Sequence, residues 1–500
     1  MNPDGTGRRA QWMLPLALVL AVVLVFGRSV GFSFLVWDDP GNVARNPYLA
    51  PPTLQSLGHF WSHGSDNYYV PLSYTAWWGI AGLSRALCGT LEPALFHAAN
   101  VTLHALVVLL VYAWLRALVA DRLAAGVGAL VFALHPLHVE SVCWVTELRG
   151  LLCALSGFGA LLLALRGRRW SALLLFLLAL LAKPSAVAFA GLVLLQELGW
   201  RRRPWREVLA LHWPWIALAA CAVGVTRWQA SGEEVRWVTP LLERPRVAVD
   251  ALGFYLAKLA WPVRLCAEYG RSPQLVLASG SAWTGALVLA LALGAVLAWP
   301  ERRRAVCALL FFVLALLPVL GLLPFGYQEK STVADRYAYV ALAGPALGAT
   351  LLVLRFGRPA LAAALALVLA WGALSFAQAA HWRDTRALFG RVLQVNPRSI
   401  TAYTNLGVDA IESRDLEGAR LHFVRALELD PDQRAALSNL GSVECELGRY
   451  EEGLAHLREA VARHPRSIST RKNLIGGLVR AGRQEEAQAA ARELDALAPP

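Results

Sequence analysis

The sequence is poor in charged residues and has almost no lysine. Only 16% of its 500 residues are charged, whereas 57% are hydrophobic, and the mean hydropathy is +0.46. A soluble domain of ordinary composition carries about 25% charged residues. The composition therefore excludes a single soluble domain of this ordinary kind. Lysine supplies only four of the 47 basic residues. This preference for arginine, together with abundant alanine and leucine, suggests a GC-rich bacterial genome.

Cysteine is also scarce, and a continuous basic stripe is missing. The seven cysteines show no CxxC spacing and no paired framework. We interpret them as small core residues, which argues against a disulfide scaffold and against a cysteine metal site. The net charge of +12 comes from short basic clusters between apolar segments. Such clusters are typical of membrane orientation, and we expect no nucleic-acid partner.

Long apolar runs are abundant up to about residue 380. A bilayer core of roughly 30 Å is crossed by about 20 apolar helical residues. The first run follows Arg8 and Arg9 and has no small-residue cleavage site, so it is interpreted as a retained signal-anchor helix. The sequence predicts an all-α protein with about 11 transmembrane helices, at 13–36, 94–119, 124–142, 147–165, 170–183, 185–199, 208–228, 282–299, 305–324, 337–354 and 360–379.

The basic clusters give these spans a direction. If the spans alternate from a cytoplasmic N-terminus, all four clusters lie on the cytoplasmic side, at 166–169, 201–203, 302–304 and 355–358. Two other apolar stretches, 70–88 and 248–263, then do not cross and are expected to be interfacial or re-entrant helices. We therefore predict a multi-pass protein of a bacterial inner (plasma) membrane, surrounded by membrane lipid, with its C-terminal region outside the cytoplasm.

The C-terminal region is an internal repeat. Prolines recur every 34 residues at 397, 431, 465 and 499, and Asn-Leu pairs recur with the same period. A 34-residue period is the tetratricopeptide signature, in which small residues let two antiparallel helices approach closely. We predict a transmembrane domain at 1–380, with a first external loop at 37–93, and an α-solenoid at 381–500 with repeats at about 400–431, 434–465 and 468–499.

Such arrays bind extended segments or protein partners, so we expect a protein partner for this region. The aligned Asn405, Asn439 and Asn473 are candidates for a ladder that contacts the backbone of an acceptor or partner. The alternative is that Asn-Leu-Gly is part of the repeat consensus and has no binding role.

Several charged groups lie where the membrane makes them costly. A charged side chain at membrane depth costs on the order of 2.5–3.5 kcal/mol, so each is a functional candidate. In the predicted topology all of them lie on the non-cytoplasmic side. They form four groups: Asp38 and Asp39 after the first span; His135, His138 and Glu140 with Glu147 and Arg149; Lys183; and Glu329, Lys330, Asp335, Arg336, Tyr337 and Tyr339.

Each group alone also has a structural interpretation. Asp-Asp-Pro-Gly is a good turn, and the Asp335-Arg336 pair suits an interfacial ion pair. His135 and His138 are three residues apart, but Pro136 between them and the lack of a third ligand argue against a metal site there. The occurrence of all four groups at one membrane face is more informative than any single group, because a cation cluster beside carboxylates suits a lipid-phosphate donor.

At this point the chain resembles a known family. The segments "VWDDPGNVARNPYL", "YYVPLSYTAWWGIAGL", "ALHPLHVESVCWVTELRGLLCALSGFGALLLA", "FYLAKLAWPVRLCAEY" and "VADRYAYVALAGPALG", followed by the repeats, are similar to the transmembrane O-mannosyltransferases with tetratricopeptide repeats and their bacterial relatives. The resemblance covers nearly the whole chain in the same order.

The resemblance implies a GT-C fold glycosyltransferase. Such an enzyme moves a sugar, here mannose, from a polyprenyl-phosphate donor to a hydroxyl acceptor on the non-cytoplasmic side. The acceptor is a protein Ser or Thr, or a glycan. By the same resemblance Asp39 or Asp38 is the general base, and attack opposite the phosphate inverts the anomeric configuration.

The resemblance also implies donor-phosphate binding by Arg149 and Arg336, assisted by His135, His138 and Lys183. Cations suffice to neutralise a phosphate leaving group, so no cofactor is required, although a divalent metal stays open. The relatives often carry Lys-Glu where this chain has Lys183-Pro184. This departure argues against a catalytic role for the Lys183 segment. Two other functions stay open, namely a polysaccharide ligase or polymerase with a lipid-linked donor, and a non-catalytic membrane-anchored repeat scaffold.

Overall fold

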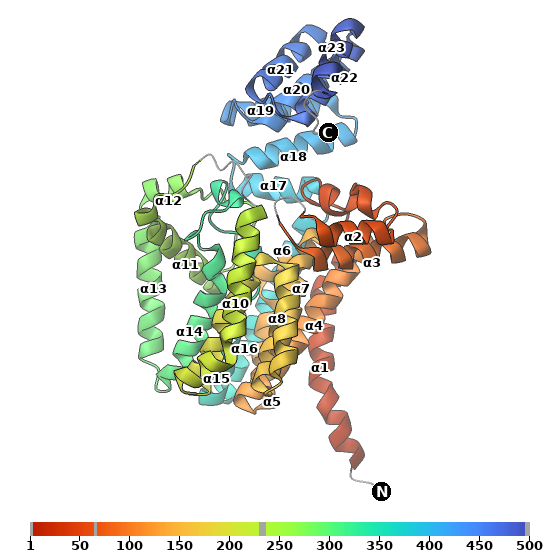
Figure 1. The fold of residues 1–500 in the computed structure, drawn as a ribbon. Helices are drawn as coiled ribbons and strands as arrows, with labels where there is room; N and C mark the ends of the chain where they lie inside the picture. Colours follow the sequence, from red (N-terminus) through yellow and green to blue (C-terminus); the bar gives the residue numbers. More distant parts are fainter. Residues whose placement is uncertain (1–3, 65–67, 230–236, 496–500) are drawn as a thin grey trace. The chain divides into compact units, whose positions relative to one another are not determined.

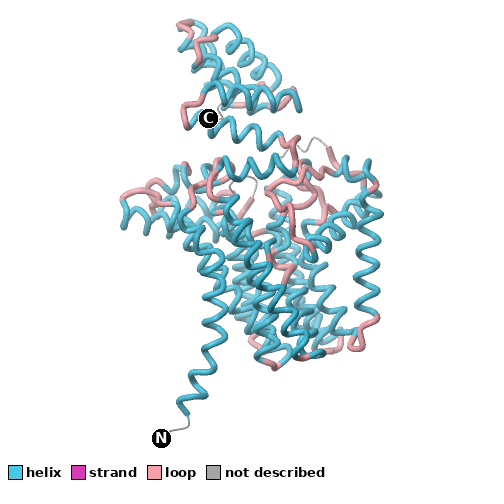
Figure 2. The backbone as a smooth tube through the Cα atoms, turned by 180° about the vertical axis from the view of Figure 1, so that it is seen from behind, coloured by secondary structure: helices cyan, strands magenta, loops and turns pink. Residues whose placement is uncertain are grey.

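The structure, a computed structural model, describes residues 4–64, 68–229 and 237–495. Within these residues the regular structure is helical and no β-strand occurs, as Figures 1 and 2 show. The predicted all-α class is thereby confirmed. The chain divides into two compact units. We call Met1–Phe34 with Asp38–Arg383 the bundle unit, and Leu35–Trp37 with Asp384–Pro500 the repeat unit.

The first half of the bundle unit contains a set of apolar helices and two further helices that lie across them near one end (Figure 1). The crossing pair, α2 and α3, belongs to the predicted first external loop. The helices of this half are α1 (Asp4–Phe26), α2 (Leu54–Ser62), α3 (Pro71–Cys88), α4 (Pro93–Val119), α5 (Arg122–Leu134), α6 (Val139–Cys143), α7 (Leu148–Leu165) and α8 (Arg169–Ala182).

The second half completes the bundle around the buried α4 and α7. Its helices are α9 (Ala188–Leu194), α10 (Trp205–Gln229), α11 (Arg244–Ala260), α12 (Pro273–Ser279), α13 (Ser281–Leu297), α14 (Arg302–Leu316), α15 (Ala343–Phe356) and α16 (Arg358–Ala379). Short 3-10 and π-helical turns connect them, among them Pro136–His138, Val145–Glu147 and Asp335–Ala338.

Several of these helices are suited to cross a membrane. Among the described residues five are long and apolar enough, and two bent pairs pass the same test together, which makes up to seven. Three shorter apolar helices, Arg169–Ala182, Pro184–Trp200 and Ala343–Phe356, match further predicted spans. The protein is thus a multi-pass helical membrane protein, and the number of 11 crossings stays a prediction.

Two predicted spans differ in detail from the helices observed. The span predicted at 305–324 corresponds to α14, which ends at Leu316 because Pro318 enters a 3-10 turn. The span predicted at 337–354 starts as a helix only at Ala343, since Asp335–Ala338 forms a separate 3-10 turn. Both changes lengthen the irregular segment between α14 and α15, which carries Asp335 and Arg336.

Three of the four basic clusters lie at one end of the bundle unit. Arg303 donates to the carbonyl oxygens of Gly199 and Leu198, both at 2.8 Å. The rings of Trp299 and Phe356 are 5.7 Å apart. These contacts join the ends of three helical hairpins, so the clusters at 201–203, 302–304 and 355–358 share one end of the unit, which we call the basic end.

The repeat unit contains α17 (Thr385–Val395) and three helix pairs. The pairs begin at Ile400, Arg434 and Ile468, at the 34-residue period of the sequence. They are α18 (Ile400–Glu412) with α19 (Leu416–Leu429), α20 (Arg434–Glu446) with α21 (Tyr450–Arg463), and α22 (Ile468–Arg480) with α23 (Gln484–Asp495). Phe423 and Ala426 pack with Ala436 and Leu440 of the next pair, so neighbouring pairs share one core.

Candidate functional site

Asp39 lies in a turn of the segment 37–93, the predicted first external loop, which folds against the α6–α7 connection. Pro40 opens a five-residue π-helical turn directly after Asp39. The loop packs Val43 and Phe60 into one apolar cluster with Val145 of the connection and Leu148, the first residue of α7. This packing brings two segments about 100 residues apart in the sequence into contact.

The Asp39 carboxylate is completely buried and hydrogen-bonded. Its Oδ1 accepts from the Thr146 hydroxyl at 2.7 Å and from the Thr146 backbone N–H at 3.2 Å. Two donors from one residue hold this carboxylate in a single orientation. The Asp38 side chain, by contrast, is partly exposed.

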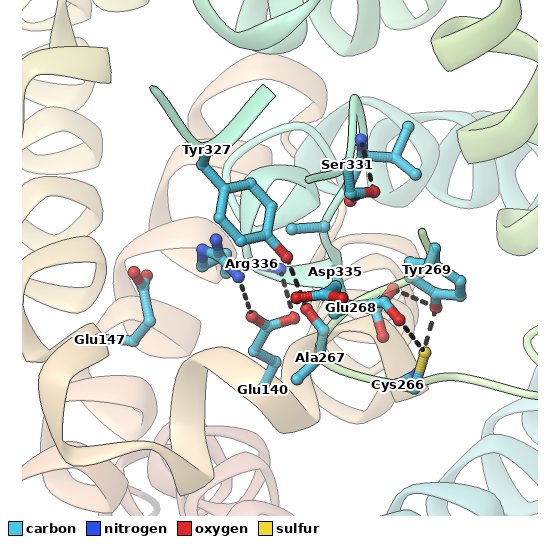
Figure 3. Close-up of polar contacts among 12 residues, drawn as sticks. Glu140, Glu147, Cys266, Ala267, Glu268, Tyr269, Tyr327, Ser331, Asp335 and Arg336 are labelled. Atoms are coloured by element: carbon cyan, nitrogen blue, oxygen red, sulfur yellow. Dashed lines mark hydrogen bonds and ion pairs between the residues drawn. The ribbon is translucent and has the colours of Figure 1, made fainter. Parts of the chain in front are cut away.

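Arg336 and Glu140 form a buried ion pair beside this connection (Figure 3). Arg336 Nη1 lies 2.5 Å from Glu140 Oε1, and the Arg336 backbone N–H donates to the other carboxylate oxygen at 3.2 Å. The guanidinium also lies over the rings of Tyr327, at 4.3 Å, and Tyr337, at 4.9 Å. Ion pairing and stacking together hold the guanidinium in place.

Lys183 pairs with Glu147 from the opposite side of the connection. Its ammonium lies 2.7 and 3.1 Å from the two carboxylate oxygens. Lys183 takes this position because Pro184 disfavours helix for the residue before it, so α8 ends at Ala182. Gly150 faces the pair, and a Cβ atom there would lie 2.6 Å from Glu147 Oε2.

A small pocket lies between these cations. Its lining includes Gly150, Lys183, Ser185, Arg336 and Tyr339. Two of the five residues predicted to bind donor phosphate therefore line one pocket. Arg149 is on the adjoining turn, where its Nε donates to the Thr146 carbonyl oxygen at 3.2 Å and leaves the terminal nitrogens of the guanidinium available for an anion.

Asp335 precedes Arg336 in the chain but is not among the residues that line the pocket. It is buried and accepts a hydrogen bond of 2.7 Å from the Tyr269 hydroxyl (Figure 3). Burial raises the pKa of Asp335 well above its usual range, and the nearby Glu140 charge raises it further, whereas the Tyr269 hydroxyl, Lys258 and Arg336 oppose the rise. A carboxyl group in this setting is suited to support Arg336 rather than to meet a substrate.

The two histidines are buried away from the pocket lining. His135 Nδ1 accepts from the Leu137 N–H at 3.2 Å, and its Nε2 lies 3.2 Å from the Leu259 carbonyl oxygen. His138 lies with its ring centroid 4.4 Å from that of Tyr339 and 4.5 Å from that of Phe132. In this structure both rings pack inside the bundle unit.

The three repeat asparagines are partly buried. The Asn405 amide donates to the Thr401 carbonyl oxygen of its own helix at 2.8 Å. The Asn473 amide donates to Ser438 Oγ at 2.9 Å and so joins two repeats. These bonds use amide donors that the asparagines would need to contact the backbone of an acceptor or partner protein. Asn439 occupies the same position in the second repeat.

Sequence reasoning missed Thr146 and the Tyr327 ring that lies over Arg336, whereas Tyr337 was among the candidates. Thr146 stands directly before Glu147, and a hydroxyl residue beside charged groups in an apolar segment was the available signal. No sequence pattern pointed to Tyr327, because it contacts Arg336 across a loop.

Nothing in the described residues provides a metal site of three or more His, Cys, Asp or Glu side chains. The groups that face the pocket are cations paired with carboxylates. They are suited to hold an anion.

The fold and the pocket together define a multi-pass helical membrane protein with a charged site at the end of its bundle unit opposite the basic end, followed by helix-pair repeats. Comparison with known proteins agrees with this class. The chain is homologous to proteins named protein O-mannosyl-transferase, which carry the family symbol TMTC.

It is 36% identical to mouse Protein O-mannosyl-transferase TMTC1 over 135 residues, which is 25% of this chain and 14% of the mouse protein. It is 28% identical to the Drosophila melanogaster Tmtc1 protein over 153 residues, 29% of this chain and 16% of that protein. A Caenorhabditis elegans protein O-mannosyl-transferase is 22% identical over 436 residues, which is 81% of this chain and 61% of the relative.

The chain therefore aligns with only a minor part of the mouse and fly relatives. In the C-terminal region, residues 405–497 match the family described as "BTAD: Bacterial transcriptional activator domain". This match falls within the helix pairs of the repeat unit and is compatible with tetratricopeptide-like repeats.

Proposed function

We propose that this protein is an integral-membrane glycosyltransferase of the GT-C type. It transfers a sugar, mannose by the names of its relatives, from a polyprenyl-phosphate donor to Ser or Thr hydroxyls of proteins. Transfer takes place at the non-cytoplasmic side of a bacterial inner membrane, with the N-terminus in the cytoplasm. The observation that carries the proposal is the pocket that both Lys183 and Arg336 line.

We assign the donor phosphate to this pocket because a phosphate group needs more than one cation and the pocket is lined by two. Lys183 and Arg336 each pair with a carboxylate in the structure described here. Glu140 holds Arg336 through two contacts, whereas Lys183 is partly exposed and can exchange Glu147 for a phosphate oxygen. Arg149, on the adjoining turn, adds donors at the same mouth. Charge-assisted contacts of this kind neutralise the phosphate as it leaves.

The base is assigned to the Asp38–Asp39 pair, with Asp39 preferred. Asp39 bonds to Thr146, in the same turn as Glu147 and Arg149, so it lies next to the residues assigned to the phosphate. An acceptor hydroxyl needs its proton removed as its oxygen attacks the anomeric carbon, and a carboxylate within about 3 Å accepts that proton. The bond between the anomeric carbon and the phosphate oxygen breaks, and polyprenyl phosphate leaves.

Asp39 is completely covered in this structure, so an acceptor reaches it only after the first external loop moves. Asp38 is partly exposed and is the alternative base. Separate Asp38→Asn and Asp39→Asn variants distinguish the two. Transfer of mannose from polyprenyl-phosphate mannose to an acceptor peptide is measured in membranes, with expression and membrane insertion as controls.

Loss of transfer in one of the two variants is expected, by on the order of 10²-fold or more. Full activity in both variants would remove the carboxylate base from the mechanism. Transfer to a glycan and not to peptides would instead support the polysaccharide ligase reading.

A further inference from the structure

An apolar groove of the bundle unit begins about one helical turn from the proposed donor pocket, where Phe312 precedes Ala315 and Gly344 follows Val340, and it extends toward the basic end. It is a cavity of about 250 Å³ between α11, α13, α14 and α15. Its wall includes Leu256, Leu309, Gly348 and Leu352, and Trp299 lines the part nearest the basic end. The surface inside it is almost wholly apolar, so it suits a hydrocarbon chain.

Two arginines stand where this groove meets the basic end. Arg302 lies three residues before Ala305 and seven before Leu309, so helical periodicity places it on the groove face of α14. Arg355 follows Leu351 and Leu352 by four and three residues, which places it on the groove face of α15. Both side chains are exposed.

Two neighbouring arginines of α14 are already engaged. Arg303 donates to Gly199 and Leu198, and Arg304 pairs with Glu301 at 3.0 Å and lies over the Trp200 ring. For Arg302 and Arg355, no ion pair with any described residue occurs. The groove therefore ends in two available cations beside an aromatic ring.

We propose that this groove binds an anionic phospholipid, with an acyl chain against Gly348 and the headgroup phosphate at Arg302 and Arg355. Apolar walls and a cationic mouth are complementary to such a lipid, and basic pockets between membrane helices recognise anionic headgroups. The tryptophan at the mouth suits the headgroup level of a bilayer.

The position of the mouth argues for a phospholipid rather than the polyprenyl donor. Arg336 precedes α15, whereas Arg355 lies in its last turn. A helix of 14 residues is about 21 Å long, so the two cation sets are separated by most of a bilayer core. A headgroup at Arg302 and Arg355 therefore belongs to the leaflet opposite the proposed donor phosphate.

Native mass spectrometry of the full chain in detergent tests this inference without any transfer assay. The probes are phosphatidylglycerol, phosphatidylcholine and polyprenyl phosphate, each added separately and then in competition. The wild-type protein is expected to retain one phosphatidylglycerol in preference to phosphatidylcholine. The Arg302→Gln/Arg355→Gln variant should bind it roughly 30-fold more weakly.

Two further variants keep the result interpretable. Gly348→Phe fills the groove from a position where an added Cβ meets nothing within 4 Å, so the fold tolerates it, and retention should be lost. Arg166→Gln/Arg168→Gln removes two exposed arginines of the fourth basic cluster, which lies between α7 and α8 and outside the groove lining, and it should leave retention unchanged.

Equal retention of phosphatidylcholine, or unchanged binding in the Arg302→Gln/Arg355→Gln variant, would overturn the proposal. It would also be overturned if polyprenyl phosphate displaced phosphatidylglycerol and was itself lost in Gly348→Phe. Neither outcome depends on whether the protein transfers mannose. The lipid proposal can therefore be refuted while the proposed function stands, and the reverse also holds.

Discussion

Replacing Thr146 with valine removes the hydroxyl that orients Asp39 and keeps the shape of the side chain. The hydroxyl donates to Asp39 Oδ1 at 2.7 Å, and Asp39 is completely buried. The backbone N–H of residue 146 still donates to the same oxygen at 3.2 Å. The variant therefore loosens the carboxylate without leaving it wholly unbonded.

The size of the effect follows from this contact. A hydrogen bond to a charged group contributes about 1.5–3 kcal/mol. If this energy positions the base for the reaction, its loss lowers the rate roughly 10- to 150-fold, since each 1.36 kcal/mol is a factor of ten. Because Thr146 is a positioning residue, kcat should fall while KM for the donor stays nearly constant.

Steady-state transfer from polyprenyl-phosphate mannose to an acceptor peptide measures both constants. Thr146→Ser retains the hydroxyl and should retain most of the activity. In an Asp39→Asn background, Thr146→Val should cost no further activity, because the carboxylate base that the hydroxyl positions is already gone. A wild-type kcat in Thr146→Val would refute the reasoning, as would a full additional loss in the double variant.

Three other predictions concern the pocket and the repeats. Lys183→Met leaves Glu147 buried without its cation and should destabilise the protein by about 3 kcal/mol, whereas Lys183→Met/Glu147→Gln should recover thermal stability but not donor binding. The Glu444 hydrogen bond raises the pKa of His456, so this pair should protect α20 and α21 from hydrogen exchange fully below about pH 6.5 and progressively less as pH rises through the raised pKa. Gly441→Ala places a Cβ 2.7 Å from the Gly453 carbonyl oxygen and should lower the stability of the repeats by about 1–3 kcal/mol, measured by thermal unfolding.

Each of these has a matched control. Lys183→Arg keeps the charge and should stay near wild-type stability, so a loss equal to that of Lys183→Met would contradict the ion-pair argument. His456→Gln should remove the pH difference in exchange, and its persistence would show that other groups cause it. Gly390→Ala, where an added Cβ meets nothing within 4 Å, should be neutral, and a comparable loss there would contradict the close-approach argument.

The sequence was informative where a pattern repeats or where the membrane penalises charge. Apolar runs predicted the helices, and the 34-residue period predicted the starts of three helix pairs. Charged residues in apolar segments pointed to Asp39, Lys183 and Arg336 because few structural reasons justify them there.

The pairing of those charges was beyond the sequence. Arg336 meets Glu140, 196 residues away, and Lys183 meets Glu147, 36 residues away, so the partners depend on how the bundle packs. The hydrogen bond between Thr146 and Asp39 likewise depends on the apolar cluster under the first loop. No local sequence pattern predicts this cluster.

The most direct test of the central claim is mass spectrometry of exported proteins and surface glycans from cells with and without this protein. A protein O-mannosyltransferase predicts that hexose disappears from Ser and Thr residues of exported proteins when the protein is absent and returns with the wild-type chain but not with a variant that lacks the base. Unchanged exported proteins, with or without a change in surface glycans, would contradict the claim.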